Sequence, residues 1–101
     1  MTIINGSSVF EWDDTKEQIN IKKHGMKFKT ALLVFEDENR IEMYDKEHSD
    51  DEDRFITIGM INDTAVVTVA AVVYTERGEA IRIISARTAT KKEQEMYYYD
   101  C

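Results

Sequence analysis

The stretch AIRIISARTATKKEQEMY, residues 80–97, decides how the chain folds. Its first half is rich in isoleucine and alternates its side chains at a period of two, which is typical of a β-strand, so we expect a strand over 80–87. Its second half opens with Thr90-Lys91-Lys92-Glu93, a Thr-x-x-Glu capping box that satisfies orphan backbone donors at a helix start. A strand therefore leads directly into a C-terminal helix, and four basic residues surround the junction: Arg82, Arg87, Lys91 and Lys92.

Two helices are predicted nearer the N-terminus. A short strand over 9–12 precedes Asp14-Thr15-Lys16-Glu17, whose carboxylates favour a helix start, and Gly25 closes this helix after about His24. The apolar face of this helix is thin, but one of its faces carries polar residues at spacings of three and four: Lys16, Asn20, Lys23 and His24. A second helix over 28–35 carries a core stripe of Phe28, Ala31, Leu32 and Phe35.

The rest of the chain predicts an antiparallel meander. Strands over 54–61, 65–75 and 80–87 are joined by turns at Asn62-Asp63-Thr64 and at 76–79, and such short connections make antiparallel neighbours. A further strand over 40–44 and a charged loop over 46–53 precede them. We therefore expect a single α+β domain over residues 1–101, with residues 1–8 as a poorly ordered tail.

Composition narrows the classes of protein. The chain has 101 residues, of which 43% are hydrophobic and 33% charged, which is typical of a globular domain. No apolar run approaches the roughly 20 residues that a membrane span needs, and no secretory signal is visible. Cys101 is the single cysteine, and no Cys/His spacing of the metal-binding kind occurs. We expect a cytoplasmic protein without a metal or other cofactor.

The negative charge is concentrated in one segment. The net charge is −7, and residues 36–53 hold ten of the 20 acidic residues against Arg40 and Lys46. The other 83 residues carry ten acidic and eleven basic side chains. A mildly basic remainder is compatible with an anionic ligand elsewhere on the surface.

Four segments resemble the BrnT toxins of BrnT–BrnA toxin–antitoxin pairs: FEWDDTKEQINIKKHGMKF at 10–28, DRFITIG at 53–59, VVYTERG at 72–78 and IRIISARTATKKEQEMY at 81–97. The resemblance implies a RelE-like fold, in which a twisted antiparallel sheet packs against two N-terminal helices. It also implies a ribonuclease that cleaves RNA and inhibits translation, restrained by a BrnA-like antitoxin. A dimer or a heterotetramer with the antitoxin is compatible with it, and DNA would be reached only through the antitoxin.

Metal-independent RNA cleavage can use the ribose 2′-hydroxyl as nucleophile. A base takes its proton, cations stabilise the crowded phosphorane, and an acid protonates the leaving oxygen. Arginine suits the second task because its charged fork matches phosphate geometry. The candidate catalytic residues are Arg54, Arg77, Arg87, His24, Glu93 and Tyr97. The candidate RNA-binding residues are Lys23, Arg82, Lys91 and Lys92.

Ordinary structural roles remain open for several candidates. His24 can close its helix through the dipole, Glu93 has a complete role in the capping box, and Tyr97 can pack on the sheet. His48 carries little weight because it lies in the acidic loop. The net charge also supports an inactive interaction module that binds the antitoxin and takes part in operon regulation. We expect the antitoxin to cover Arg54, Arg77 and Arg87 and to leave the 36–53 segment outside the contact.

Overall fold

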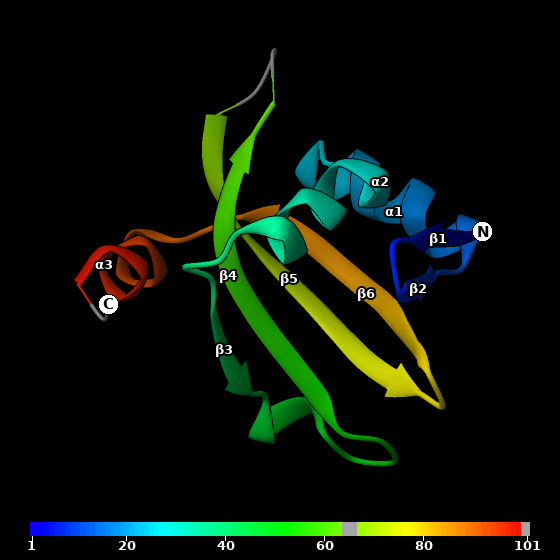
Figure 1. Ribbon diagram of the computed structural model, residues 1–101. Helices are drawn as coiled ribbons and strands as arrows, with labels where there is room; N and C mark the ends of the chain where they lie inside the picture. The colour runs from blue at the N-terminus through cyan, green and yellow to red at the C-terminus, as the bar shows by residue number, and fades with distance from the viewer. Residues whose placement is uncertain (64–66, 100–101) are drawn as a thin grey trace.

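The computed structural model describes residues 1–63 and 67–99, and its centre is a six-stranded sheet in the order β1-β2-β6-β5-β4-β3 (Figure 1). The strands are β1 (Thr2–Asn5), β2 (Ser8–Glu11), β3 (Ile41–Tyr44), β4 (Arg54–Asn62), β5 (Val67–Arg77) and β6 (Ala80–Thr88). The helices are α1 (Asp14–His24), α2 (Phe28–Ala31) and α3 (Lys91–Tyr99), with 3-10 turns η1 (Leu32–Glu36) and η2 (Lys46–His48). Within the described residues, no helix has the length and hydrophobicity to cross a membrane.

The predicted α+β class is confirmed, and so is the antiparallel meander of β4, β5 and β6. The sheet as a whole is mixed rather than antiparallel, because β2 pairs parallel with β6 in the register Phe10↔Ile81. This parallel pair is possible because α1, α2 and most of the sheet intervene in the chain between the two strands. Three parts of the prediction lie outside the described residues: residue 64 of the turn, residues 65–66 of the predicted strand 65–75, and Cys101.

The N-terminal residues correct another expectation. Instead of a poorly ordered tail, Thr2–Asn5 form β1, which pairs antiparallel with β2 in the register Ile3↔Phe10. The N-terminal amine of Met1 also donates to the carbonyl oxygen of Trp12 at 2.9 Å. These backbone hydrogen bonds order the N-terminal residues, which the polar Gly6-Ser7-Ser8 sequence had suggested would form a poorly ordered tail.

Both predicted N-terminal helices exist, with local differences. Asp13 rather than Asp14 caps α1, because its Oδ1 accepts from the backbone N–H of Lys16 at 3.0 Å. Gly25 ends α1 at φ 71°, a conformation that costs glycine little. The predicted helix 28–35 is divided between α2 and η1, and its core stripe is buried at Phe28, Ala31 and Leu32 and partly buried at Phe35.

The two faces of the sheet are covered differently. The larger core lies on the first face, where the fully buried Phe28 of α2 and Val34 of η1 join Val72 of β5 in one cluster. A smaller cluster on the second face joins Ile58, Ala71, Ala89 and Tyr97, the last of these from α3. Figure 1 shows α3 at one end of the sheet, away from α1 and α2. The second face is therefore covered by α3 only at that end.

We expect Leu32→Ala to lower the free energy of unfolding by about 2–5 kcal/mol, because it leaves a cavity in the larger core. Leu32 is 6% exposed, whereas Ile19 on α1 is 60% exposed and supplies a matched control. Ile19→Ala should change the free energy by less than about 0.5 kcal/mol. Urea unfolding followed by circular dichroism measures both, and equal losses in the two variants would contradict this description of the core.

Candidate active site

A groove crosses the part of the second face that α3 leaves open. It has a volume of about 510 Å³ and lies between β4, β5, β6, the end of α1 and the turn η2. Its lining combines a few apolar residues of the strands with basic and acidic side chains from α1, from η2 and from strand ends. The lining residues are Lys23, His24, Asp45, Glu47, His48, Arg54, Ile56, Val73, Ile84, Ser85 and Arg87. We call this hollow the second-face groove.

Four candidates that are far apart in the sequence meet in this groove: Lys23, His24, Arg54 and Arg87. Lys23 and His24 come from the last turn of α1, Arg54 from the start of β4, and Arg87 from the end of β6. Both arginines line the same groove, but the register offsets them along the sheet: Arg54 lies opposite Thr75, whereas Arg87 lies opposite Ala71, whose partner on β4 is Ile58. The sheet therefore gathers cations that the sequence separates by up to 64 positions.

Asn20 sets the position of the α1 contribution. Its side chain is 5% exposed, and Nδ2 donates to the carbonyl oxygens of Met26 and Ala86, each at 2.9 Å. Its Oδ1 accepts from the backbone N–H of Ala86 at 3.1 Å. Asn20 was expected on a functional face of the helix, but these three buried bonds make it an anchor. Lys23 and His24 follow it by three and four residues and so project from the same side of the helix.

Arg54 has spare hydrogen-bonding capacity. It is half-buried, and its Nε is buried without a hydrogen-bond partner among the described residues. Its backbone N–H donates to Ser49 Oγ at 2.9 Å, and Ser49 Oγ donates to the carbonyl oxygen of Asp45 at 2.6 Å. The backbone of Arg54 is thus fixed to the loop that follows β3. A buried guanidinium N–H without a partner is costly, so Arg54 keeps a donor that its described neighbours do not use.

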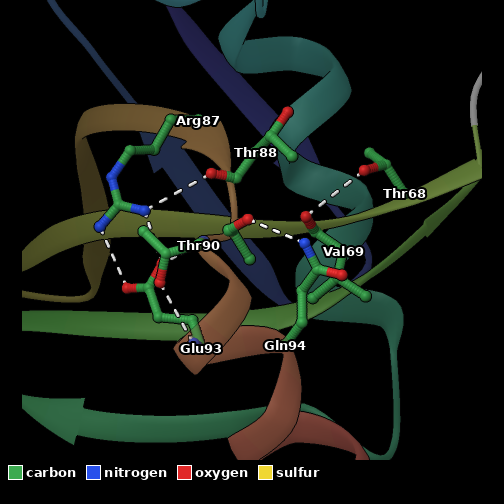
Figure 2. Close-up of polar contacts among 8 residues, drawn as sticks. Thr68, Val69, Arg87, Thr88, Thr90, Glu93 and Gln94 are labelled. Atoms are coloured by element: carbon green, nitrogen blue, oxygen red, sulfur yellow. Dashed lines mark hydrogen bonds and ion pairs between the residues drawn. The ribbon is translucent and has the colours of Figure 1, made fainter.

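Arg87 is held by Glu93. Its Nη1 and Nη2 donate to Glu93 Oε1 and Oε2 at 2.6 and 3.1 Å, which forms a bidentate pair (Figure 2). The same carboxylate accepts from the backbone N–H of Thr90 at 2.8 Å, and the Glu93 N–H donates to Thr90 Oγ1 at 3.2 Å. The predicted capping box is therefore present, and its acid also carries the ion pair.

These contacts change the acid–base properties of both partners. The hydrogen bond from Arg87 lowers the pKa of Glu93, against the effect of burial, and the Thr90 N–H lowers it further. The hydrogen bond to Glu93 correspondingly raises the pKa of Arg87. Both groups are charged at neutral pH, so part of the positive charge of Arg87 is compensated before any ligand binds.

His48 is a groove residue to which sequence analysis gave little weight. Its Nδ1 lies 3.1 and 3.0 Å from the two oxygens of Asp45, and Asp45 is the less exposed partner at 12% against 63%. An ionised carboxylate only accepts, so Nδ1 carries a hydrogen here and Nε2 is the nitrogen left for proton transfer. No sequence motif marks His48. Its loop reaches Arg54 because β3 pairs with β4.

The acidic segment lies closer to the cations than expected. Asp45 and Glu47 line the second-face groove itself. Asp50, Asp51 and Glu52 line a neighbouring hollow of about 170 Å³ together with His48 and Arg54. The cationic candidates and the acidic segment are therefore not separated on the surface, because Arg54 and His48 border both hollows. An anion entering the groove meets carboxylates on one wall.

The remaining candidates do not line the groove. Arg77 pairs with Glu52 at 3.5 Å, and Arg82 pairs with Glu11 of the parallel neighbour β2 at 3.8 Å. Lys91 and Lys92 are exposed on the first turn of α3. Tyr97 is 7% exposed and donates to Asp37 Oδ2 at 2.5 Å on another part of the surface. The strand-to-helix junction therefore contributes Arg87 to the groove and leaves the other three cations outside it.

The groove combines groups suited to a phosphodiester. Arg54 and Arg87 present fixed positive charge, and two imidazoles, of His24 and His48, line the same groove. Among the described residues, no group of three His, Cys, Asp or Glu side chains is arranged to hold a metal ion.

Comparison with known proteins identifies one family. A family model described as a ribonuclease toxin, BrnT, of a type II toxin–antitoxin system matches residues 12–93. The matched region includes the groove residues of α1, η2 and the strands, together with Glu93. No curated protein matches the chain.

We expect Glu93→Gln to lower the free energy of unfolding by about 1–3 kcal/mol at pH 7, because it leaves Arg87 partly buried without its anion and weakens the capping box. The folded-state pKa of Glu93 lies below its ordinary value. Its carboxylate therefore stabilises the fold above that ordinary value, and the contribution is lost as the pH falls through the folded-state pKa. The difference from wild type should shrink between pH 7 and about pH 3.

Glu95→Gln is the matched control, because Glu95 is exposed on the same helix and loses the same charge. Its effect should stay within about 0.5 kcal/mol at both pH values. A pH-independent loss in Glu93→Gln would show that the ionised pair with Arg87 is not what stabilises this junction. Urea unfolding at each pH measures the difference.

Proposed function

Since the chain belongs to the BrnT family of ribonuclease toxins from type II toxin–antitoxin systems, we propose that it is an endoribonuclease that cleaves RNA without a metal ion and thereby inhibits translation. The proposal includes a RelE-like fold and action in the cytoplasm. Membership of a type II family implies an antitoxin partner, and we propose that this partner is BrnA-like. RNA is the substrate, and DNA is contacted only through the antitoxin.

One observation carries the proposal. Lys23, His24, Arg54 and Arg87 line a single groove, and His48 lines it with them. Cleavage of RNA by its own 2′-hydroxyl needs fixed cations beside the phosphorus, one group that accepts a proton and another that donates one. The groove supplies both kinds of group, and Nε of Arg54 is a buried donor without a partner among the described residues.

The proposed reaction is an in-line displacement at phosphorus. The 2′-hydroxyl oxygen forms a bond to phosphorus while the bond from phosphorus to the 5′-oxygen breaks, which gives a 2′,3′-cyclic phosphate and a 5′-hydroxyl end. His24 takes the proton from the 2′-hydroxyl. His48, held at Nδ1 by Asp45, gives a proton to the leaving oxygen. Arg54 and Arg87 bind the non-bridging oxygens as negative charge accumulates on them.

The other candidates have supporting roles in this proposal. Glu93 is a positioning residue, because its contacts are with Arg87 and Thr90. Tyr97 holds α3 to the sheet through Asp37. Lys23 lines the groove and binds RNA backbone. The exposed cations Arg77, Arg82, Lys91 and Lys92 add general attraction for RNA rather than chemistry.

The purified protein should cleave single-stranded RNA in excess EDTA. Arg54→Ala removes a donor to the developing charge, so we expect about a 100- to 1,000-fold loss in kcat/KM. His24→Ala removes a proton-transfer group and should lose about 100- to 10,000-fold. Single-turnover cleavage of a labelled RNA oligonucleotide measures both, and circular dichroism checks that each variant is folded.

Arg77→Ala is the informative comparison, because it removes the same side chain from a position outside the groove lining. At most a few-fold loss is expected there. Losses at Arg77 as large as at Arg54 would contradict the proposed site. Activity that returns only when a divalent metal is added would contradict the proposed mechanism.

Complete absence of cleavage by folded wild-type protein would favour a different class of function. In that case the protein is an inactive interaction module that binds its antitoxin and takes part in operon regulation. The acidic net charge of −7 and the carboxylates of Asp45 and Glu47 in the groove favour this second candidate, since both weaken binding of a polyanion.

The antitoxin should cover the second-face groove, because an inhibitor that occupies the phosphate-binding cations excludes RNA. We expect Arg54→Glu to weaken antitoxin binding by about tenfold or more, since it reverses a half-buried charge at the groove. Arg77→Glu lies further along the sheet and should weaken binding less. Titration calorimetry with the antitoxin encoded beside this chain measures both constants.

Asp50→Lys serves as the control for the charge change, because Asp50 is exposed in the neighbouring acidic hollow. Its effect should be within a few-fold of wild type. An Asp50→Lys variant that abolishes binding while Arg54→Glu leaves it intact would move the interface from the groove to the acidic loop.

A further inference from the structure

A second hollow continues from the second-face groove along α1. It has a volume of about 200 Å³ and is lined by Lys16, Ile19, Asn20, Lys23, His24, Ile84 and Ser85. Four of these residues, Lys23, His24, Ile84 and Ser85, also line the groove. We call this hollow the α1–β6 cleft. A chain leaving the groove past His24 would enter it directly.

The cleft differs from its surroundings in charge. Its lining contains Lys16 and Lys23 but no carboxylate. Four other hollows on the described surface each include at least one acidic side chain. On a chain with a net charge of −7, a basic lining without carboxylates is selective for an anion.

The cleft also presents an apolar surface between its cations. Ile19 is 60% exposed although the rest of the outer face of α1 is polar, and Ile84 on β6 is half-buried beside it. Lys16 and Lys23 are seven residues apart, which corresponds to about 10.5 Å along the helix axis. Ile19 lies between them in the sequence. Cations that flank an apolar surface match a nucleic-acid strand, which alternates phosphates with flat apolar bases.

We propose that the α1–β6 cleft binds the part of a single-stranded RNA next to the bond cleaved in the groove. Lys16 and Lys23 contact phosphates, and a base lies against Ile19 and Ile84, where the hydroxyl of Ser85 offers a hydrogen bond to its edge. This inference rests on the proposed function for the identity of the substrate. Its binding step does not require cleavage, so the two can be tested separately.

The probe is a fluorescent single-stranded RNA of about ten nucleotides with a 2′-O-methyl group on every ribose, which removes the nucleophile but keeps the phosphates. Anisotropy titrations at several salt concentrations give affinity and salt dependence. Lys16→Gln should make the negative slope of log affinity against log salt shallower by about 0.7. The ratio of wild-type to variant affinity should then be about fivefold larger at 0.1 M salt than at 1 M salt. Ile19→Gln should weaken binding without changing this slope.

Lys22→Gln is the matched control, because Lys22 is exposed on the same helix but does not line the cleft. It should leave both affinity and slope unchanged. Equal effects of Lys16→Gln and Lys22→Gln would overturn the proposal, since they would reflect only general charge. A Lys16→Gln variant that weakens antitoxin binding but not RNA binding would also overturn it and make the cleft a protein-binding surface.

The unmodified RNA separates the two proposals. If Lys16→Gln and Ile19→Gln weaken binding of the probe as expected but wild type cleaves no unmodified RNA, the cleft stands and the proposed ribonuclease activity fails. If wild type cleaves RNA and both variants bind and cleave a ten-nucleotide RNA like wild type, the activity stands and the cleft fails.

Discussion

The placement of α1 depends on one buried amide. β2 covers the edge of β6 only as far as Arg82, so the backbone N–H and C=O of Ala86 need another partner on that side. The Asn20 side chain supplies a donor and an acceptor to these two groups and thus stands in for the next strand. A helix with a thin apolar face would otherwise gain little from packing. The same contact places Lys23 and His24 at the groove.

The C-terminal helix depends on two comparable polar contacts at its ends. At its start, Glu93 satisfies the Thr90 N–H and holds Arg87. Near its end, Tyr97 donates to Asp37; burial opposes ionisation of Asp37, but this bond and the Met60 N–H lower its pKa overall. Gly59 lets Val34 and Asp37 approach β4 closely, because a Cβ atom there would lie 2.9 Å from Val34 Cγ1 and 3.3 Å from Asp37 Oδ2. The helix that covers one end of the second face thereby also fixes a cation at the groove beside it.

The local elements were largely predictable from the sequence, whereas the meeting of side chains was not. The capping box at Thr90, the stripe at Phe28 and the meander follow from spacings of a few residues, which short-range rules describe. The role of Asn20 and the parallel pairing of β2 depend on partners in β6 that are 66 or more residues away. The ordered β1 pairs with β2, at an edge that only the assembled sheet defines. The position of His48 in the groove depends on the pairing of β3 with β4. Arg77 and Arg82 were candidates because they lie at a turn beside a predicted strand or within one, but in the sheet they pair with Glu52 and Glu11.

The charge distribution gains its meaning only from this assembly. A net charge of −7 argues against affinity for a polyanion, yet electrostatic attraction at contact distance is set by the groups within about one Debye length, roughly 10 Å. The linings of the groove and the α1–β6 cleft together hold four basic side chains, Lys16, Lys23, Arg54 and Arg87, and two acidic ones, Asp45 and Glu47. The carboxylates lie in the same groove as His48 and Arg54, where they weaken the attraction for an anion. In an acidic chain, a local group of basic side chains therefore determines where an anion binds, whereas the negative net charge lowers the affinity for anions elsewhere on the surface.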